Sequence, residues 1–168
     1  LTGVSKSGTG ITIVSSEKPK AYFEQKEKIS VLLKKADIRW VPTYYSSSIP
    51  LISKLGNSKK LEKKSFEVCR HEKINIVHCR GYIAALTGLK LKKKMGIKFI
   101  FDMRGFWADE RIEGGLWSKK NPLTSSLYRY FKKKETEFIN NADYVVALTE
   151  NAANEILIWK KVSRKLSI

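Results

Sequence analysis

Cysteine, proline and long apolar runs are all scarce in this sequence, and each scarcity excludes a class of protein. Of its 168 residues only two are cysteine and four are proline. No run approaches the roughly 18 consecutive apolar residues of a membrane-spanning helix. Cys69 and Cys79 lack the spacing of a zinc site or a disulfide framework, so we expect two reduced thiols. No secretory signal opens the sequence, which predicts a soluble, cytoplasmic protein.

Acidic residues are also scarce, at 16 against 33 basic ones, which gives a net charge of +17. A basic surface attracts nucleic acid, anionic membrane or phosphorylated small molecules. Most of the basic residues are lysine, whereas arginine dominates where phosphate or guanine is bound bidentately. The charge therefore fits solubility or membrane attraction better than base readout, and we expect no nucleic-acid partner.

The remaining composition predicts one folded domain that spans residues 1–168. Hydrophobic residues make up 42% of the chain and charged residues 29%, which is near the average for a globular domain. The first residue is Leu1 rather than methionine, so we expect a piece of a longer protein.

Short apolar runs alternate with stretches of helical periodicity along the whole chain. We expect strands at 11–15, 38–41, 74–78, 98–102 and 144–148, with a further strand beginning at 166–168. Between them we expect helices at 20–35, 51–73 with a possible break at Gly56 and Asn57, 82–96, 122–140 and after Thr149. Pro42 and the segment 46–50 are expected in a loop, as is the stretch rich in glycine and tryptophan up to Asn121. This order predicts an α/β fold, a Rossmann-like three-layer α/β/α domain with a mainly parallel sheet covered on both faces.

Ligands of such sheets bind beyond the carboxyl ends of the strands. The third expected strand ends there in His78, Cys79, Arg80, Gly81 and Tyr82. Backbone N–H groups near Gly81, together with Arg80, can hold a carboxylate, hydroxyl or phosphate. Alternatively, His78 only forms a hydrogen bond within the sheet edge. A nucleophilic pair of His78 and Cys79 is disfavoured because neighbouring strand residues point to opposite faces.

The fourth expected strand leads into DMRGFWADER at residues 102–111, which combines three acids, two arginines and two aromatic residues. Phe106 and Trp107 offer faces that stack on sugar rings, while carboxylates and guanidinium groups bind hydroxyls in a fixed orientation. This mixture predicts a carbohydrate ligand. The alternative is a structural loop in which Asp102 pairs with Arg104 and the aromatic rings cover the core.

Thr149 and Glu150 follow the fifth expected strand, where Thr149 suits a helix N-cap and Glu150 the positive end of the helix dipole. The lysine runs at 59–60, 63–64, 92–94 and 132–134 are typical of solvated helix faces. No P-loop, zinc-protease or serine-hydrolase motif is present.

Three segments carry a resemblance to a known family: VHCRGY at 77–82, FDMRGFWADE at 101–110 and ADYVVALTENAANEI at 142–156. Together they resemble the N-terminal domain of a GT-B fold glycosyltransferase of family 4, and the order of the earlier elements agrees. The resemblance implies two Rossmann-like domains that face a cleft, with the acceptor bound by the first and the nucleotide-sugar donor mainly by the second. The first strand would then precede Leu1, and the donor domain would follow Ile168.

The resemblance further implies retaining transfer of a sugar from a nucleotide-sugar to a glycan or lipid-linked acceptor, as in polysaccharide biosynthesis. It implies no cofactor and no obligatory metal. Family members often carry a histidine in the loop after the fourth strand, where this chain has Asp102, Met103 and Arg104. We therefore take Asp102 and Arg104 as the catalytic candidates. The substrate-binding candidates are His78, Arg80, Gly81, Tyr82, Gly105, Phe106, Trp107, Asp109, Glu110, Thr149 and Glu150.

Two other functions are compatible with the residues. One is a non-catalytic Rossmann-like module that binds a phosphorylated ligand with the same loops, and the other, supported by charge alone, is nucleic-acid binding. A further expectation concerns anionic membrane. Two lysine clusters would form a basic face that docks peripherally on the inner side of the membrane, namely 90 and 92–94 on one helix with 59–60 and 63–64 on another.

Overall fold

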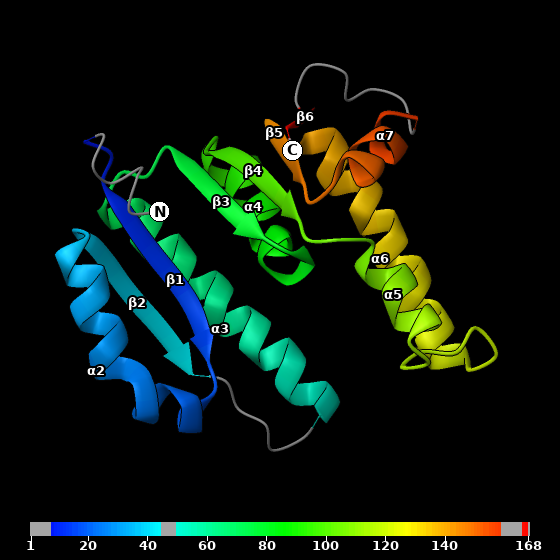
Figure 1. The fold of residues 1–168 in the computed structure, drawn as a ribbon, viewed down its shortest axis with the longest axis horizontal. Helices are drawn as coiled ribbons and strands as arrows, with labels where there is room; N and C mark the ends of the chain where they lie inside the picture. Colours follow the sequence, from blue (N-terminus) through cyan, green and yellow to red (C-terminus); the bar gives the residue numbers. More distant parts are fainter. Residues whose placement is uncertain (1–7, 45–49, 159–165, 168) are drawn as a thin grey trace. The chain divides into compact units, whose positions relative to one another are not determined.

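The computed structural model describes residues 8–44, 50–158 and 166–167, with the backbone alone for 50–55 and 166–167. Internal contacts divide the chain into two compact units, Leu1–Glu72 and Lys73–Ile168, and each is described by itself. All paired strands are parallel, in a two-stranded sheet in the first unit and a four-stranded sheet in the second. The expected α/β fold with parallel strands is confirmed, with its strands in two sheets (Figure 1).

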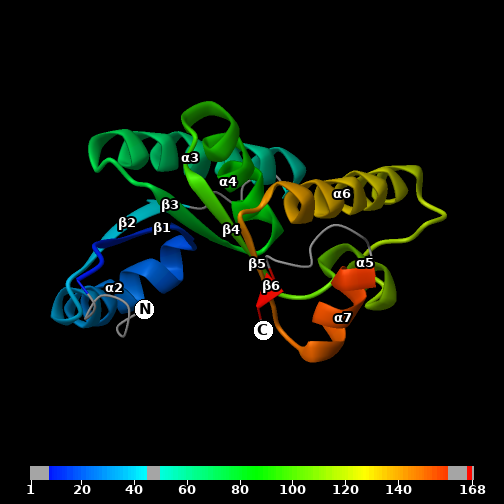
Figure 2. The same ribbon diagram turned by 90° about the horizontal axis from the view of Figure 1, so that it is seen from above.

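The first unit is a two-stranded sheet between two helices. Strand β1 (Ile11–Glu17) pairs with β2 (Ile38–Tyr44) from Ile11↔Ile38 to Glu17↔Tyr44. Helix α2 (Pro19–Lys35) lies on one side of this sheet and α3 (Pro50–His71) on the other (Figure 2). Beyond the sheet, the Glu72 carboxylate accepts hydrogen bonds from Thr12 and Arg39, which tie β1 and β2 to the end of α3.

The second unit has the strand order β3-β4-β5-β6. Its strands are β3 (Ile76–Arg80), β4 (Lys98–Met103), β5 (Tyr144–Ala147) and β6 (Leu166–Ser167). The register places Arg80 beside Asp102 and Asp102 beside Val146, so one row of side chains crosses three strands. The carboxyl ends of these strands therefore come together at one edge of the sheet.

The core of the second unit lies between this sheet and two helices, α4 (Tyr82–Met95) and α6 (Pro122–Asn141). Alternate residues of β4 supply it, because Phe99, Phe101 and Met103 are almost fully buried on one face of the strand. Two further helices, α5 (Trp107–Glu113) and α7 (Glu150–Ile158), follow the carboxyl ends of β4 and β5. Cys79 lies in this core and Cys69 is buried in the first unit, and neither forms a disulfide bond within the described residues, in agreement with the expected reduced thiols.

Three local expectations prove wrong. Pro42 belongs to β2 rather than to a loop, and a proline is tolerated there because a strand of a two-stranded sheet has one unpaired edge. Helix α3 runs without a break through Gly56 and Asn57, and Asn57 is buried. The stretch before Asn121 is not all loop, since α5 occupies residues 107–113. The expected loop residues 46–49 lie outside the described ranges.

Candidate functional site at the carboxyl ends of β3 to β5

The turn between β3 and α4 begins the candidate site. The Gly81 N–H donates to the Asp102 carbonyl at 2.9 Å and so continues the β3–β4 pairing past the end of β3. Gly81 has φ +79°, a conformation that residues other than glycine rarely adopt, and a Cβ added there would meet open space. The turn therefore requires glycine for its backbone conformation, and the space beside it is open to a ligand.

An imidazole and a carboxylate meet beside this turn. His78 Nε2 lies 3.3 Å from Asp102 Oδ2; the imidazole side chain is 50% exposed and the carboxylate 14%. Cys79 faces the core instead, so the expected separation of His78 and Cys79 onto opposite faces is confirmed. Asp102 forms its pair with His78, and no pair between Asp102 and Arg104 occurs among the described residues.

Two arginines flank the pair of His78 and Asp102. Arg80 and Arg104 are both exposed, and Arg104 forms no ion pair within the part of the chain that the structure describes. The next residue, Gly105, has φ +130°, and a Cβ on it would collide with the Glu110 carboxylate. Gly105 thus lets the chain turn from β4 toward α5 with Glu110 folded against it.

Three of the expected sugar-stacking or binding side chains are packed against other rings or the core. Tyr82 is buried and its ring stacks on Trp107 at 5.8 Å between centroids. Trp107 also contacts the rings of Phe131 and Trp117, and the Arg111 guanidinium lies 5.0 Å from its centroid. Phe106 packs against the same core. These contacts give the three aromatic residues a structural role beside the site.

Asp109 belongs to a hydrogen-bonded network that reaches from α5 to α6. It accepts from Tyr128 Oη at 2.7 Å and from Lys132 Nζ at 2.8 Å. Lys132 also donates to Glu135 at 2.5 Å, and Glu135 accepts from the Tyr82 hydroxyl. The Tyr82 hydroxyl lies 3.3 Å from the Gly105 carbonyl as well, so the network connects the turn after β3, the turn after β4 and helix α6.

Burial sets the protonation behaviour of this network. Glu135 is fully buried, and its desolvation raises the pKa of the carboxyl group despite the opposing effect of Lys132. Desolvation and the Glu135 carboxylate together raise the pKa of the Tyr82 hydroxyl. For Asp109, burial acts to raise the pKa, but hydrogen bonds from Lys132 and Tyr128 outweigh it and lower the pKa.

Thr149 and Glu150 open helix α7 after β5. Thr149 Oγ1 accepts from the Ala152 N–H at 3.2 Å, which confirms the expected N-cap. Glu150 occupies the first turn and is exposed. Both residues follow β5 at the sheet edge where His78 and Asp102 lie, and both stand at the N-terminal end of α7, which is the positive end of its dipole.

Three residues of the network, Tyr128, Lys132 and Glu135, were not singled out in the sequence. The run KKKETE at 132–137 has the composition of a solvated helix face, and the interpretation of Lys132 as such a residue is wrong. No pattern in the run marks Glu135 as buried. A signal was present only in the spacing, because 128, 132 and 135 share one face of a helix.

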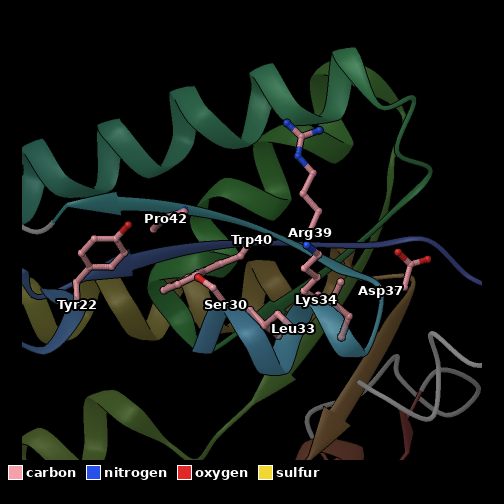
Figure 3. Close-up of a pocket in the computed structure, with 9 residues that line it drawn as sticks. Tyr22, Ser30, Leu33, Lys34, Asp37, Arg39, Trp40 and Pro42 are labelled. Carbon is pink, nitrogen blue, oxygen red and sulfur yellow. The ribbon is translucent and has the colours of Figure 1, made fainter. Parts of the chain in front are cut away.

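The first unit contains two hollows. One of about 410 Å³ follows the groove between α2 and the first half of β2, and Figure 3 shows the Tyr22 and Trp40 rings in it. The Arg39 side chain points toward α3 (Figure 3), and its guanidinium donates to the Glu72 carboxylate. The other, of about 430 Å³, lies at the carboxyl end of β2. Across the described ranges, no group of three or more histidine, cysteine or acidic residues could hold a metal ion.

Comparison with known proteins gives one informative match. The model of Glycosyltransferase Family 4 matches residues 2–168. No curated protein matches the chain.

Proposed function

Because the chain belongs to glycosyltransferase family 4, as an N-terminal domain of the GT-B type, we propose that it binds the acceptor in an enzyme that transfers a sugar from a nucleotide-sugar donor. The acceptor in this proposal is a glycan or a lipid-linked sugar. The donor would be bound mainly by a second domain. The observation that carries the proposal is the pair of His78 and Asp102 beside the open turn at Gly81, between two exposed arginines.

Each of these groups has a task that suits sugar transfer. The Asp102 carboxylate accepts hydrogen bonds from sugar hydroxyls, and the neighbouring imidazole of His78 keeps its orientation. Arg104 and Arg80 supply positive charge where the diphosphate leaves the donor. In the retaining reaction, the bond from the anomeric carbon to the diphosphate breaks, a bond to the acceptor oxygen forms on the same face, and the acceptor proton goes to the departing phosphate.

The family's loop histidine is absent after β4, but the neighbouring strand β3 supplies an imidazole beside Asp102. His78 comes from β3 and reaches the carboxylate of Asp102, the penultimate residue of β4. We propose that His78 supplies the polar contact to the reacting sugar that a histidine after the fourth strand supplies elsewhere. Asp102 then acts through His78 as well as directly on the sugar.

Arg104→Ala tests the proposal in the protein that carries this domain together with its donor domain. We expect a loss of turnover of about 100-fold, the order seen when one charge-stabilising group is removed from a site, with an unchanged melting temperature. Arg129→Ala is the matched control, because Arg129 is also exposed but lies on α6 outside the candidate site. Equal activity of both variants, or a lowered melting temperature with retained activity for Arg104→Ala, would contradict the assigned role.

The non-catalytic alternative makes a different prediction for the same protein. A module that only binds a phosphorylated ligand would retain its ligand in the presence of nucleotide-sugars and would release no nucleotide. Nucleotide release that depends on acceptor therefore separates the two functions.

Ion pairs within the chain weaken the expectation that the two lysine clusters dock on an anionic membrane. Lys92 binds Asp143 at 2.6 Å, Lys93 binds Glu137 at 2.6 Å, and Lys64 binds Glu67 at 3.1 Å. Each pairing removes a positive charge from the expected basic face. None of the helices in the described ranges is both long and apolar enough to cross a membrane.

A further inference from the structure

The hollow at the carboxyl end of β2 is lined by three lysines and two hydroxyl-bearing residues. Its lining residues are Thr43, Tyr44, Lys60, Lys63, Lys64 and Glu67, all in the first unit. The three lysines stand at positions i, i+3 and i+4 of α3, so they share one face of the helix. Lys59 directly precedes Lys60 in the sequence but does not line the hollow.

The charges of this hollow are unbalanced. Lys64 is paired with Glu67 at 3.1 Å, and this neighbour lowers the pKa of the Glu67 carboxyl group. Lys60 and Lys63 form no ion pair with any residue in the described ranges. Three ammonium groups against one carboxylate leave two positive charges around a concave surface of about 430 Å³.

The floor of the hollow is held in place by contacts within the unit. Thr43 Oγ1 donates to the Ser15 carbonyl at 2.8 Å, which fixes the end of β2 against β1. The Tyr44 ring packs edge-on against Tyr22 at 5.2 Å between centroids and is half-exposed toward solvent. A rigid floor lets the lysines bind an anion without first ordering the backbone.

From these features we infer that the hollow lined by Lys60, Lys63 and Lys64 binds the phosphate group of a phosphorylated small molecule or lipid headgroup. Lysine binds phosphate as a point charge, and two excess positive charges match a phosphate dianion or a diphosphate. The Tyr44 ring and the methylene stems of the lysines give an apolar wall for the part of the ligand that carries the phosphate. The inference goes beyond the proposed function, because it concerns a phosphate site in the first unit and uses none of the residues of the candidate site in the second.

The test is a titration of the 168-residue chain with inorganic pyrophosphate at constant ionic strength, followed by NMR. We expect the amide signals of Thr43 and Tyr44 to shift in a saturable way. Lys60→Ala and Lys63→Ala should each weaken binding about fivefold, and the double variant about 25-fold, as expected for the loss of one or two charges near 4 Å from the ligand. Lys59→Ala removes the same charge from the same helix and should leave the affinity unchanged.

Equal weakening by Lys59→Ala, or no saturable shift at Thr43 and Tyr44, would overturn the inference, because binding would then reflect only the net charge. Two further probes separate the sources of the phosphate: glucose 6-phosphate in solution, and vesicles that contain phosphatidic acid. Dependence on Lys60 and Lys63 with either probe supports the site and names its source, and independence with both overturns it. None of these measurements requires sugar transfer. A full-length protein that shows no transferase activity would therefore refute the proposed function without contradicting the phosphate site.

Discussion

Glu135 shows at the scale of a single residue how surroundings change a side chain that the sequence presents as a surface acid. It lies fully buried on α6, where it accepts from Lys132 and from the Tyr82 hydroxyl. Its desolvation raises the pKa of the carboxyl group. Since the folded chain then holds a proton that the unfolded chain has lost, the free energy of unfolding falls as pH rises from the ordinary glutamate value of about 4.3 to the higher folded value.

Glu135→Gln should abolish this decrease, because an amide has no proton to lose in that range. Its carbonyl oxygen still accepts from Lys132, and its NH2 group donates to the Tyr82 oxygen, whose O–H is then directed to the Gly105 carbonyl. The measurement is the urea midpoint of wild type and variant between pH 4 and pH 8. Glu135→Ala should instead lower the free energy of unfolding by about 3 kcal/mol at pH 7, because the Tyr82 hydroxyl and the Lys132 ammonium lose their acceptor.

Glu137→Gln is the matched control for Glu135→Gln on the same helix. Hydrogen bonds from Lys134 and Lys93 lower the pKa of Glu137, so its stabilisation is present above the ordinary glutamate pKa and is lost as pH falls through the folded value. The two variants should therefore change the pH dependence with opposite sign. The same sign for both would contradict the assigned environment of Glu135.

Helix α6, which carries Tyr128, Lys132 and Glu135, shows at the scale of an element how one side chain caps a helix. The Asn121 side chain accepts from the Leu123 N–H at 3.0 Å and from the Thr124 N–H at 3.3 Å. Asn121→Ala should cost about 1 kcal/mol of stability, the usual effect of losing an N-cap, as measured by chemical denaturation. Asn121→Asp should retain the stability because a carboxylate accepts the same bonds and suits the positive helix end. A loss in both variants would show that packing, rather than the cap, is what Asn121 provides.

The net charge of +17 acts at the scale of the whole molecule. Like charges repel more in the compact state than in the unfolded chain, and salt screens this repulsion over a Debye length of about 10 Å at 0.1 M. The melting temperature should therefore rise by a few degrees, on the order of 1 kcal/mol, between 10 and 150 mM sodium chloride. Phosphate at the same ionic strength should raise it further in wild type than in Lys60→Ala. A melting temperature that falls with added sodium chloride would show that ion pairs outweigh the repulsion.

The sequence alone determined the order of helices and strands, their parallel arrangement and several of their ends, because these follow from local periodicity and capping. Gly96 ends α4 in the left-handed conformation that glycine favours, and Thr149 caps α7 as expected. The residues of the segments 77–82, 101–110 and 142–156 were also sufficient for the family resemblance, which the family match confirms. Only tertiary structure decided which polar side chains meet, since His78 and Asp102 come from different strands and Glu135 is buried by residues far from it in sequence. Burial and charge pairing depend on those distant neighbours, and a run such as KKKETE has the same composition whether its glutamate faces water or the core.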